Sequence, residues 1–288
     1  MSRAEKTTPT VVKPTPHGSE SDLKRTLQAL QCAVAEQSGG TFSAVALGLA
    51  CPVDTARGII THGGKIGLHA GANLAALASD ATGLPAFIRT ELAMACLGEH
   101  RFGAGKGRKN LVVLTVGTGV GAGVVIDGML YRGSNGVAGE IGHVPVDLSA
   151  SAKVCRTCGR KGCLEAYASS AALLERGVGE HWQTANDVAA AAERGEPRAI
   201  DAIKVTAEMI GVVMALCVNT FDPEILVLRG GTARAVWPVG GASARKIFTS
   251  LSLSSQTPVE FSPLGEDGVF WGLAAEWPAF CSNHGHEA

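Results

Sequence analysis

Four side chains that commonly bind zinc lie close together in the chain, with the spacing His143-x11-Cys155-x2-Cys158-x4-Cys163. One imidazole and three thiolates form a closed tetrahedral set for a structural zinc ion. Basic residues stand between the thiols, and their positive charge favours the thiolate form that binds metal. These residues are Arg156, Arg160 and Lys161. A redox-active or disulfide-bonded pair of Cys155 and Cys158 is the alternative that the spacing leaves open.

Two carboxylates stand where such a metal site would fix them. Glu140 precedes His143 by three residues, and Glu165 follows Cys163 by two. If zinc folds this loop back on itself, the two carboxylates and the imidazole converge. Such a set suits hydrogen bonding to the hydroxyls of a polyol. The alternative for each Glu is a solvated surface residue, which the metal ligands on either side disfavour.

A glycine-rich stretch over residues 117–123 separates two apolar runs. It fits neither G-x-G-x-x-G nor the P-loop consensus, which also needs a Lys before Ser or Thr. We interpret it as a tight hairpin without bulky side chains. Its backbone N–H groups and the Thr118 hydroxyl suit phosphate oxygens, but a plain hairpin is an equal alternative.

The elements around these motifs alternate between helix and strand, which is typical of an α/β fold. Apolar spacing predicts helices over 19–37, 71–81, 90–99, 197–220, 242–250 and 268–279. Apolar runs predict strands over 42–49, 86–88, 111–116, 124–126, 224–228 and 259–261. Thr90 is the expected N-cap of the third helix. Residues 1–18 are interpreted as a loose leader, and the basic, glycine-rich residues 100–110 as a solvated linker.

The composition excludes several classes of protein. Of 288 residues, 46% are hydrophobic and 18% are charged, so a sizeable core is available and wholesale disorder is excluded. A net charge of −1 argues against a broad nucleic-acid interface. No apolar run reaches the roughly 18–20 residues of a membrane helix, and the polar N-terminus does not resemble a secretory signal. We therefore expect a cytoplasmic protein without nucleic-acid or membrane partners. Inert core thiols are expected at Cys32, Cys51, Cys96, Cys217 and Cys281.

Taken together, these motifs resemble the ROK family of sugar kinases and repressors. The resemblance covers about residues 42–277. It rests on VLTVGTGVGAGVVIDGMLYRGSNGVAGEIGHVPVD, which starts at Val113, and on CRTCGRKGCLEAYAS, which starts at Cys155. The strand end LGLACPVD and the loop LVLRGGTA also resemble family motifs.

The resemblance implies an actin-like (ribonuclease H-like) ATPase fold with two lobes. Residues 1–109 would form a truncated N-terminal lobe, joined by the C-terminal helix, and residues 110–288 the lobe with the zinc loop. Sugar hydroxyls would be bound by Thr90, Glu140, His143 and Glu165, and His143 would also bind zinc. Nucleotide contacts would fall on Gly117, Thr118, Gly119, Gly230 and Gly231.

The sequence departs from the family pattern at several points. No Asp-x-Gly-Gly-Thr phosphate loop precedes Ser19, so we expect the opening β-hairpins to be missing. Thr90 and Glu91 replace the family's Asn-Asp pair, so an amide donor is lost and the catalytic carboxylate moves out by one methylene. Small misplacements of a catalytic group cost much activity, about 100-fold for about 1 Å. The C-x-x-C spacing is one residue longer than the family's C-x-C, and Arg229 replaces a glycine beside the expected adenine site.

We therefore expect ATP-dependent phosphorylation of a hydroxyl on a hexose or sugar-like small molecule. Glu91 would be the base, zinc would be structural, and Mg-ATP would be the phosphoryl donor. Two alternatives stay open. One is a sugar-binding pseudokinase, and the other is an enzyme that uses the zinc-braced acidic pocket for ATP-independent acid/base chemistry. The DNA-binding repressor branch is disfavoured because fewer than about twenty residues precede the first helix. The family association predicts a homodimer.

Overall fold

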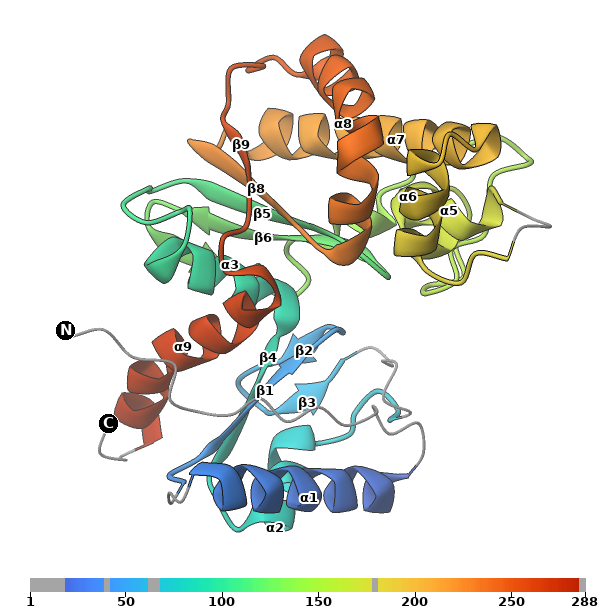
Figure 1. Ribbon diagram of the computed structural model, residues 1–288. Helices are drawn as coiled ribbons and strands as arrows, with labels where there is room; N and C mark the ends of the chain where they lie inside the picture. The colour runs from blue at the N-terminus through green and yellow to red at the C-terminus, as the bar shows by residue number, and fades with distance from the viewer. Residues whose placement is uncertain (1–18, 39–41, 62–67, 178–180, 285–288) are drawn as a thin grey trace. The chain divides into compact units, whose positions relative to one another are not determined.

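The computed structural model describes residues 19–38, 42–61, 68–177 and 181–284 (Figure 1). The leader expected over residues 1–18 lies outside them. The chain divides into two compact units, one made of Met1–Glu91 with Glu276–Ala288 and the other of Leu92–Ala275. The lobe boundary that we expect after residue 109 stays a prediction.

The first unit contains two helices and four short strands among its described residues. The helices are α1 (Glu20–Ser38) and α2 (Leu74–Thr82). The strands are β1 (Val45–Leu49), β2 (Val53–Asp54), β3 (Ile59–Ile60) and β4 (Ala86–Thr90). β1 pairs with β4 in parallel, and β2 pairs with β3 in antiparallel orientation. The apolar run at 42–49 predicts a strand buried on both faces, but the β1 residues are mostly only half-buried.

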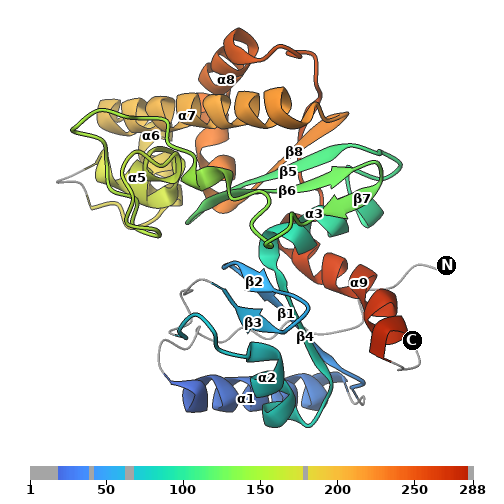
Figure 2. The ribbon, with the colours of Figure 1, turned by 180° about the vertical axis from the view of Figure 1, so that it is seen from behind.

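The second unit is built on a five-stranded sheet with the order β7-β6-β5-β8-β9. Its strands are β5 (Leu111–Val116), β6 (Val120–Ile126), β7 (Met129–Tyr131), β8 (Ile225–Arg229) and β9 (Val259–Phe261). Figure 2 shows β7 at one edge of this sheet. β5 and β8 run in parallel, and Thr115 pairs with Arg229. The carboxyl ends of these two strands therefore lie side by side.

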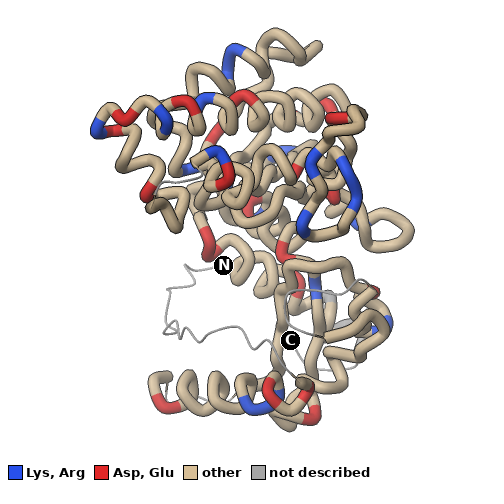
Figure 3. The backbone as a smooth tube through the Cα atoms, turned by 90° about the vertical axis from the view of Figure 1, so that its right-hand side faces the viewer, with Lys and Arg blue, Asp and Glu red and all other residues tan. Residues whose placement is uncertain are grey.

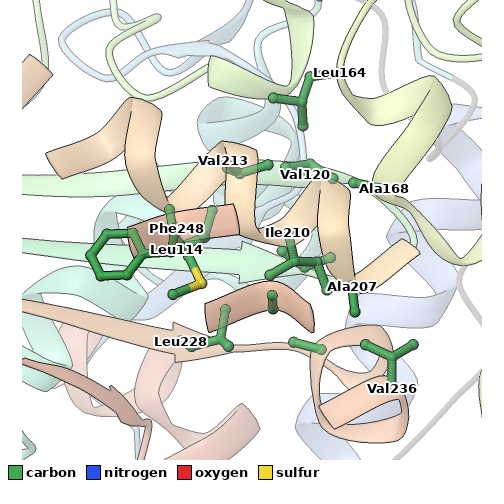
Figure 4. Packing of buried hydrophobic residues seen from close by; sticks show 14 of the residues in the cluster. Leu114, Val120, Leu164, Ala168, Ala207, Ile210, Val213, Leu228, Val236 and Phe248 are labelled. Carbon is green, nitrogen blue, oxygen red and sulfur yellow. The ribbon is translucent and has the colours of Figure 1, made fainter. Parts of the chain in front are cut away.

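Helices cover both faces of this sheet. The helices of the second unit are α3 (Glu91–Phe102), η1 (Ile141–His143), α4 (Glu165–Ala168), α5 (Ser170–Glu175), α6 (Ala185–Glu193), α7 (Pro197–Phe221), α8 (Gly231–Leu251) and η2 (Gly265–Asp267). α3 begins in the first unit, and α9 (Gly268–His284) begins in the second and ends in the first. Leu114 and Leu228 of the sheet pack with Ile210 of α7 and Val236 of α8 (Figure 4). On the opposite face, Cys96 of α3 packs with other sheet residues.

The structure corrects three local expectations. α8 starts at Gly231 rather than at Ala242, and it contains Pro238. Residues 100–110, expected as a solvated linker, are mostly exposed, but residues 100–102 belong to α3 and the rest is held near it, because the buried Glu99 carboxylate accepts the Ala104 N–H at 3.0 Å and also the Ser262 hydroxyl. Cys32 is exposed, whereas the other four scattered cysteines are buried as expected.

Charged residues are interspersed along the described chain, with Lys and Arg near Asp and Glu on many elements (Figure 3). Among the described residues, no helix combines the length and the apolar composition that a membrane span requires.

Candidate functional site

The glycine stretch forms the tight hairpin between β5 and β6 that the sequence predicts. Gly117 N–H donates to the Gly119 carbonyl at 2.9 Å, and Thr118 is exposed at the tip. A Cβ at Gly119 would lie 2.9 Å from Oε2 of Glu165, so a side chain there would displace that carboxylate. The turn thus presents backbone groups and the Thr118 side chain.

The start of α8 lies beside this hairpin. Gly230 has a φ of +101°, and the Thr232 hydroxyl donates to the Gly117 carbonyl at 3.0 Å. Ser170 N–H donates to the same carbonyl at 2.9 Å. The glycines predicted to contact nucleotide are thus brought together at the carboxyl ends of β5 and β8. Backbone N–H groups of a tight turn and of a helix start can both bind phosphate oxygens.

The four predicted metal ligands form one compact cluster. Their ligand atoms all lie within 4.8 Å of one another. Cys155 Sγ is 3.8 Å from Nδ1 of His143, and Cys158 Sγ is 3.5 Å from Cys163 Sγ. Ligand atoms around a tetrahedral zinc ion lie about 3.3–3.8 Å apart, given metal–ligand bonds of about 2.0–2.3 Å. The donor set and its spacing therefore fit zinc.

The backbone around the cluster is folded into a tight turn. Cys155 N–H donates to the Arg160 carbonyl at 2.8 Å, and Gly159 N–H donates to the Cys155 carbonyl at 2.9 Å. Gly159 and Gly162 have φ of +73° and +77°, which glycine adopts without strain. The turn is tied to α4, because the Tyr167 hydroxyl donates to Asp147 Oδ2 at 2.6 Å and accepts the Lys153 N–H at 2.9 Å.

The three thiols differ in acidity. Burial raises the pKa of Cys155, and burial together with the neighbouring Cys158 raises the pKa of Cys163 to about 12. Burial opposes ionisation of Cys158 as well, but hydrogen bonds from the backbone and side chain of Arg160 lower its pKa to about 6. Three thiolates at this spacing repel one another unless a cation lies between them. The cluster is thus suited to a divalent ion.

Glu165 joins the glycine hairpin to the segment 143–163 that carries the candidate metal ligands, which we call the metal loop. Its side chain is buried, and its Oε2 accepts the Val120 N–H at 3.0 Å. Its Oε1 accepts the Thr157 hydroxyl at 2.5 Å and lies 3.6 Å from Cys155 Sγ. One carboxylate therefore contacts the hairpin and the turn that carries two of the metal ligands.

Glu140 and His143 are held on a segment that lies flat against β6. Ala122 N–H donates to the Gly139 carbonyl at 2.8 Å, and a Cβ at Gly142 would collide with the Val120 carbonyl. Nδ1 of His143 faces the cysteine cluster, and its Nε2 lies 3.8 Å from Glu140 Oε2. At 3.8 Å the Glu140 carboxylate lies beside the outer nitrogen without a hydrogen bond to it, so both groups can face the same ligand.

The remaining predicted site residues lie elsewhere in the fold. Thr90 is the last residue of β4 and directly precedes α3, as an N-cap would, and Glu91 is the first residue of α3. Arg229 is buried at the end of β8, and its Nη2 donates to Glu266 Oε2 at 3.0 Å. Thr157, which donates to Glu165, joins the candidate site through a contact that the sequence did not reveal. The only hint of it was the additional residue between Cys155 and Cys158.

Comparisons with known proteins agree on one family. A family model described as "ROK family" matches residues 4–253. The chain is 34% identical to a glucokinase of Halalkalibacterium halodurans over 66% of this chain and 62% of that protein. It is 33% identical to a xylose repressor of Caldicellulosiruptor bescii over 67% of this chain and 52% of that protein.

A solved structure shares the fold. A ROK family glucokinase from Streptomyces griseus, in complex with glucose and AMPPNP, aligns with a TM-score of 0.74 and 27% identity. The alignment covers 91% of this chain and 88% of that one. In the sequence matches, by contrast, the chain spans 62% of the length of the Halalkalibacterium halodurans glucokinase.

Proposed function

Because the chain belongs to the ROK family, we propose that it is a sugar kinase, which transfers a phosphoryl group from ATP to a hydroxyl of a hexose or sugar-like small molecule. Its α/β, actin-like ATPase fold is the one that the sequence motifs predict. The similarity to glucokinases supports kinase chemistry. The identity of the sugar is part of the proposal.

One contact carries the proposal most directly. Val120 N–H donates to Glu165 Oε2 at 3.0 Å, so a carboxylate suited to sugar hydroxyls lies directly beside the turn suited to phosphates. A kinase needs its acceptor and its phosphoryl donor held next to each other, because positioning supplies much of the rate of phosphoryl transfer. The two groups of residues meet within one unit of the chain.

The proposed roles follow from the chemistry of each group. Glu140 and Glu165 accept hydrogen bonds from sugar hydroxyls, and His143 holds a third hydroxyl through Nε2. Backbone N–H groups of the hairpin and of the α8 start bind the phosphates. Glu91 accepts the proton of the hydroxyl that attacks the γ-phosphorus.

Two ions complete the proposal. Zinc, held by His143, Cys155, Cys158 and Cys163, would be structural and would keep Glu165 and His143 in place. Magnesium, when bound with ATP, neutralises charge that develops on the phosphates. A homodimer in the cytoplasm stays part of the proposal, as does the absence of nucleic-acid and membrane partners.

The test is ADP release measured with a panel of hexoses and N-acetylhexosamines, using wild type, Glu91→Gln and Glu91→Asp. Loss of the base should lower kcat by about 100-fold or more in Glu91→Gln, whereas Glu91→Asp should retain activity. Glu193→Gln, at an exposed position on α6, is the matched control and should behave as wild type.

Calorimetry with the same sugars separates the alternatives. Sugar binding without ADP release would replace the kinase with a sugar-binding protein or an ATP-independent enzyme. No sugar binding at all would overturn the proposal. Normal turnover in Glu91→Gln would show that Glu91 is not the base.

A further inference from the structure

We infer that Thr157 is a positioning residue that holds the Glu165 carboxylate so that a single oxygen, Oε2, faces the bound sugar. The part of this inference that concerns sugar rests on the proposed function. The part that concerns the protein is the bond between Thr157 and Glu165, which ties the metal loop to the glycine hairpin.

The bond joins two rigid parts of the chain. Thr157 lies between Cys155 and Cys158, in the turn that Gly159 N–H closes by donating to the Cys155 carbonyl. Its hydroxyl donates to Glu165 Oε1 at 2.5 Å, which is a short bond to an ionised acceptor. Such charge-assisted bonds are about twice as strong as bonds between neutral groups.

The bond from Thr157 occupies an acceptor site on one oxygen of Glu165 and leaves the other oxygen available. A carboxylate offers about four lone-pair sites. Val120 N–H occupies one on Oε2, and the Thr157 hydroxyl occupies one on Oε1. Cys155 Sγ, 3.6 Å away, lies against the same Oε1 and restricts access to it. The lone pair left on Oε2 is the acceptor best placed to take one hydroxyl from a ligand.

When a metal ion is bound, the position of Glu165 Oε1 depends more strongly on the Thr157 hydroxyl. A metal-bound cysteine is a thiolate, so Cys155 has no S–H to donate to Glu165 and instead places negative charge near it. Thr157 then supplies the hydrogen bond that keeps Oε1 beside the turn. Without it, Oε1 moves away from the sulfur, and Oε2 loses its alignment with the Val120 N–H.

Two substitutions separate this role from simple packing. Thr157→Val keeps the shape of the side chain and removes the hydroxyl, whereas Thr157→Ser keeps the hydroxyl. Both are purified with their zinc content measured. Hydrogen exchange of the Val120 amide should be about tenfold faster or more in Thr157→Val and unchanged in Thr157→Ser, because a bond to a charged group is lost only in the first.

Calorimetry provides the second measurement, with the sugar that the hexose panel identifies. Thr157→Val should bind it about tenfold more weakly, and Thr157→Ser should bind as wild type does. Wild-type exchange at Val120 in Thr157→Val would overturn the inference. Equal loss of zinc in both variants would also overturn it, because Thr157 would then only space the turn. If wild type binds no sugar, the proposed function fails, and the exchange of Val120 still decides the role of Thr157.

Discussion

At the scale of single residues, the two carboxylates buried among the described residues of the second unit each accept at least two hydrogen bonds. Glu165 receives Val120 N–H and the Thr157 hydroxyl, and Glu99 receives Ala104 N–H and the Ser262 hydroxyl. Burying an ionised group is costly unless hydrogen bonds replace its lost water. Glu99 thereby fixes the loop before β5, and Glu165 fixes the hairpin after it.

The metal cluster leads to a prediction about one ligand. Cys163→Ser replaces a thiolate with a hydroxyl, which is a poor zinc ligand, so zinc content should fall well below one ion per chain and the melting temperature should fall with it. Elemental analysis and thermal unfolding with and without a chelator check this. Cys32→Ser changes an exposed thiol outside the cluster and should keep full zinc content. Well-folded wild type without zinc would contradict the assignment.

At the scale of elements, glycines allow backbone segments to lie directly against each other. The segment that carries Glu140 and His143 lies against β6, where Gly139 meets the Ala122 carbonyl and Gly142 meets the Val120 carbonyl. Gly121 and Gly123 of β6 leave room for two residues of α3, Leu92 and Cys96. The glycines therefore allow the segment with Glu140 and His143, and also α3, to pack closely against the backbone of β6.

Substituting one of these glycines tests this packing. Gly139 has a φ of +88°, and a Cβ there would collide with the Ala122 carbonyl. Gly128 has a similar φ of +78° but has nothing within 4 Å of such a Cβ. Gly128→Ala should therefore cost only about 1–2 kcal/mol of unfolding free energy for its left-handed backbone. Gly139→Ala should cost about 1–3 kcal/mol more, from overpacking. Urea unfolding measures both, and equal losses would contradict the close packing.

At the scale of the whole molecule, the chain crosses between its two units twice, after Glu91 and after Ala275. The second unit is one continuous segment that contains the five-stranded sheet, the four candidate metal ligands and the largest hydrophobic cluster among the described residues. The first unit is assembled from both ends of the chain. The continuous segment therefore has its own core, which independent folding requires, and its own candidate metal site.

This organisation predicts the behaviour of a fragment. Residues 92–275 expressed alone should fold cooperatively and bind one zinc ion, because the core and the ligands are complete. Circular dichroism melts and elemental analysis check both properties. They should be compared with the full chain and with the same fragment carrying Cys163→Ser. A fragment that binds zinc but melts without a cooperative transition would show that the rest of the chain is needed for the core to pack.

Short-range sequence patterns predicted the helices and strands whose form depends mainly on neighbouring residues in the chain. β5 and β9 have the predicted bounds, and α7 differs from its prediction by one residue at its end, because their apolar runs and periodicity are continuous. The convergence of His143 and the three cysteines was predictable for the same reason, since these residues lie within a short stretch of chain. The glycine hairpin was predictable because few residue types fit such a turn.

Contacts between segments that are distant in the sequence determined the features that local patterns did not predict. The first half of α8 was hidden by Pro238 and two glycines, of which Gly240 is required because a Cβ there would lie 2.5 Å from Ala207 of α7. The basic stretch after α3 reads as a linker until the Glu99 carboxylate and Ser262 are placed beside it. Likewise, no local pattern links Thr157 and Glu165 to Val120. The folding of the metal loop onto β6 brings them together, and that packing makes Glu165 part of the site.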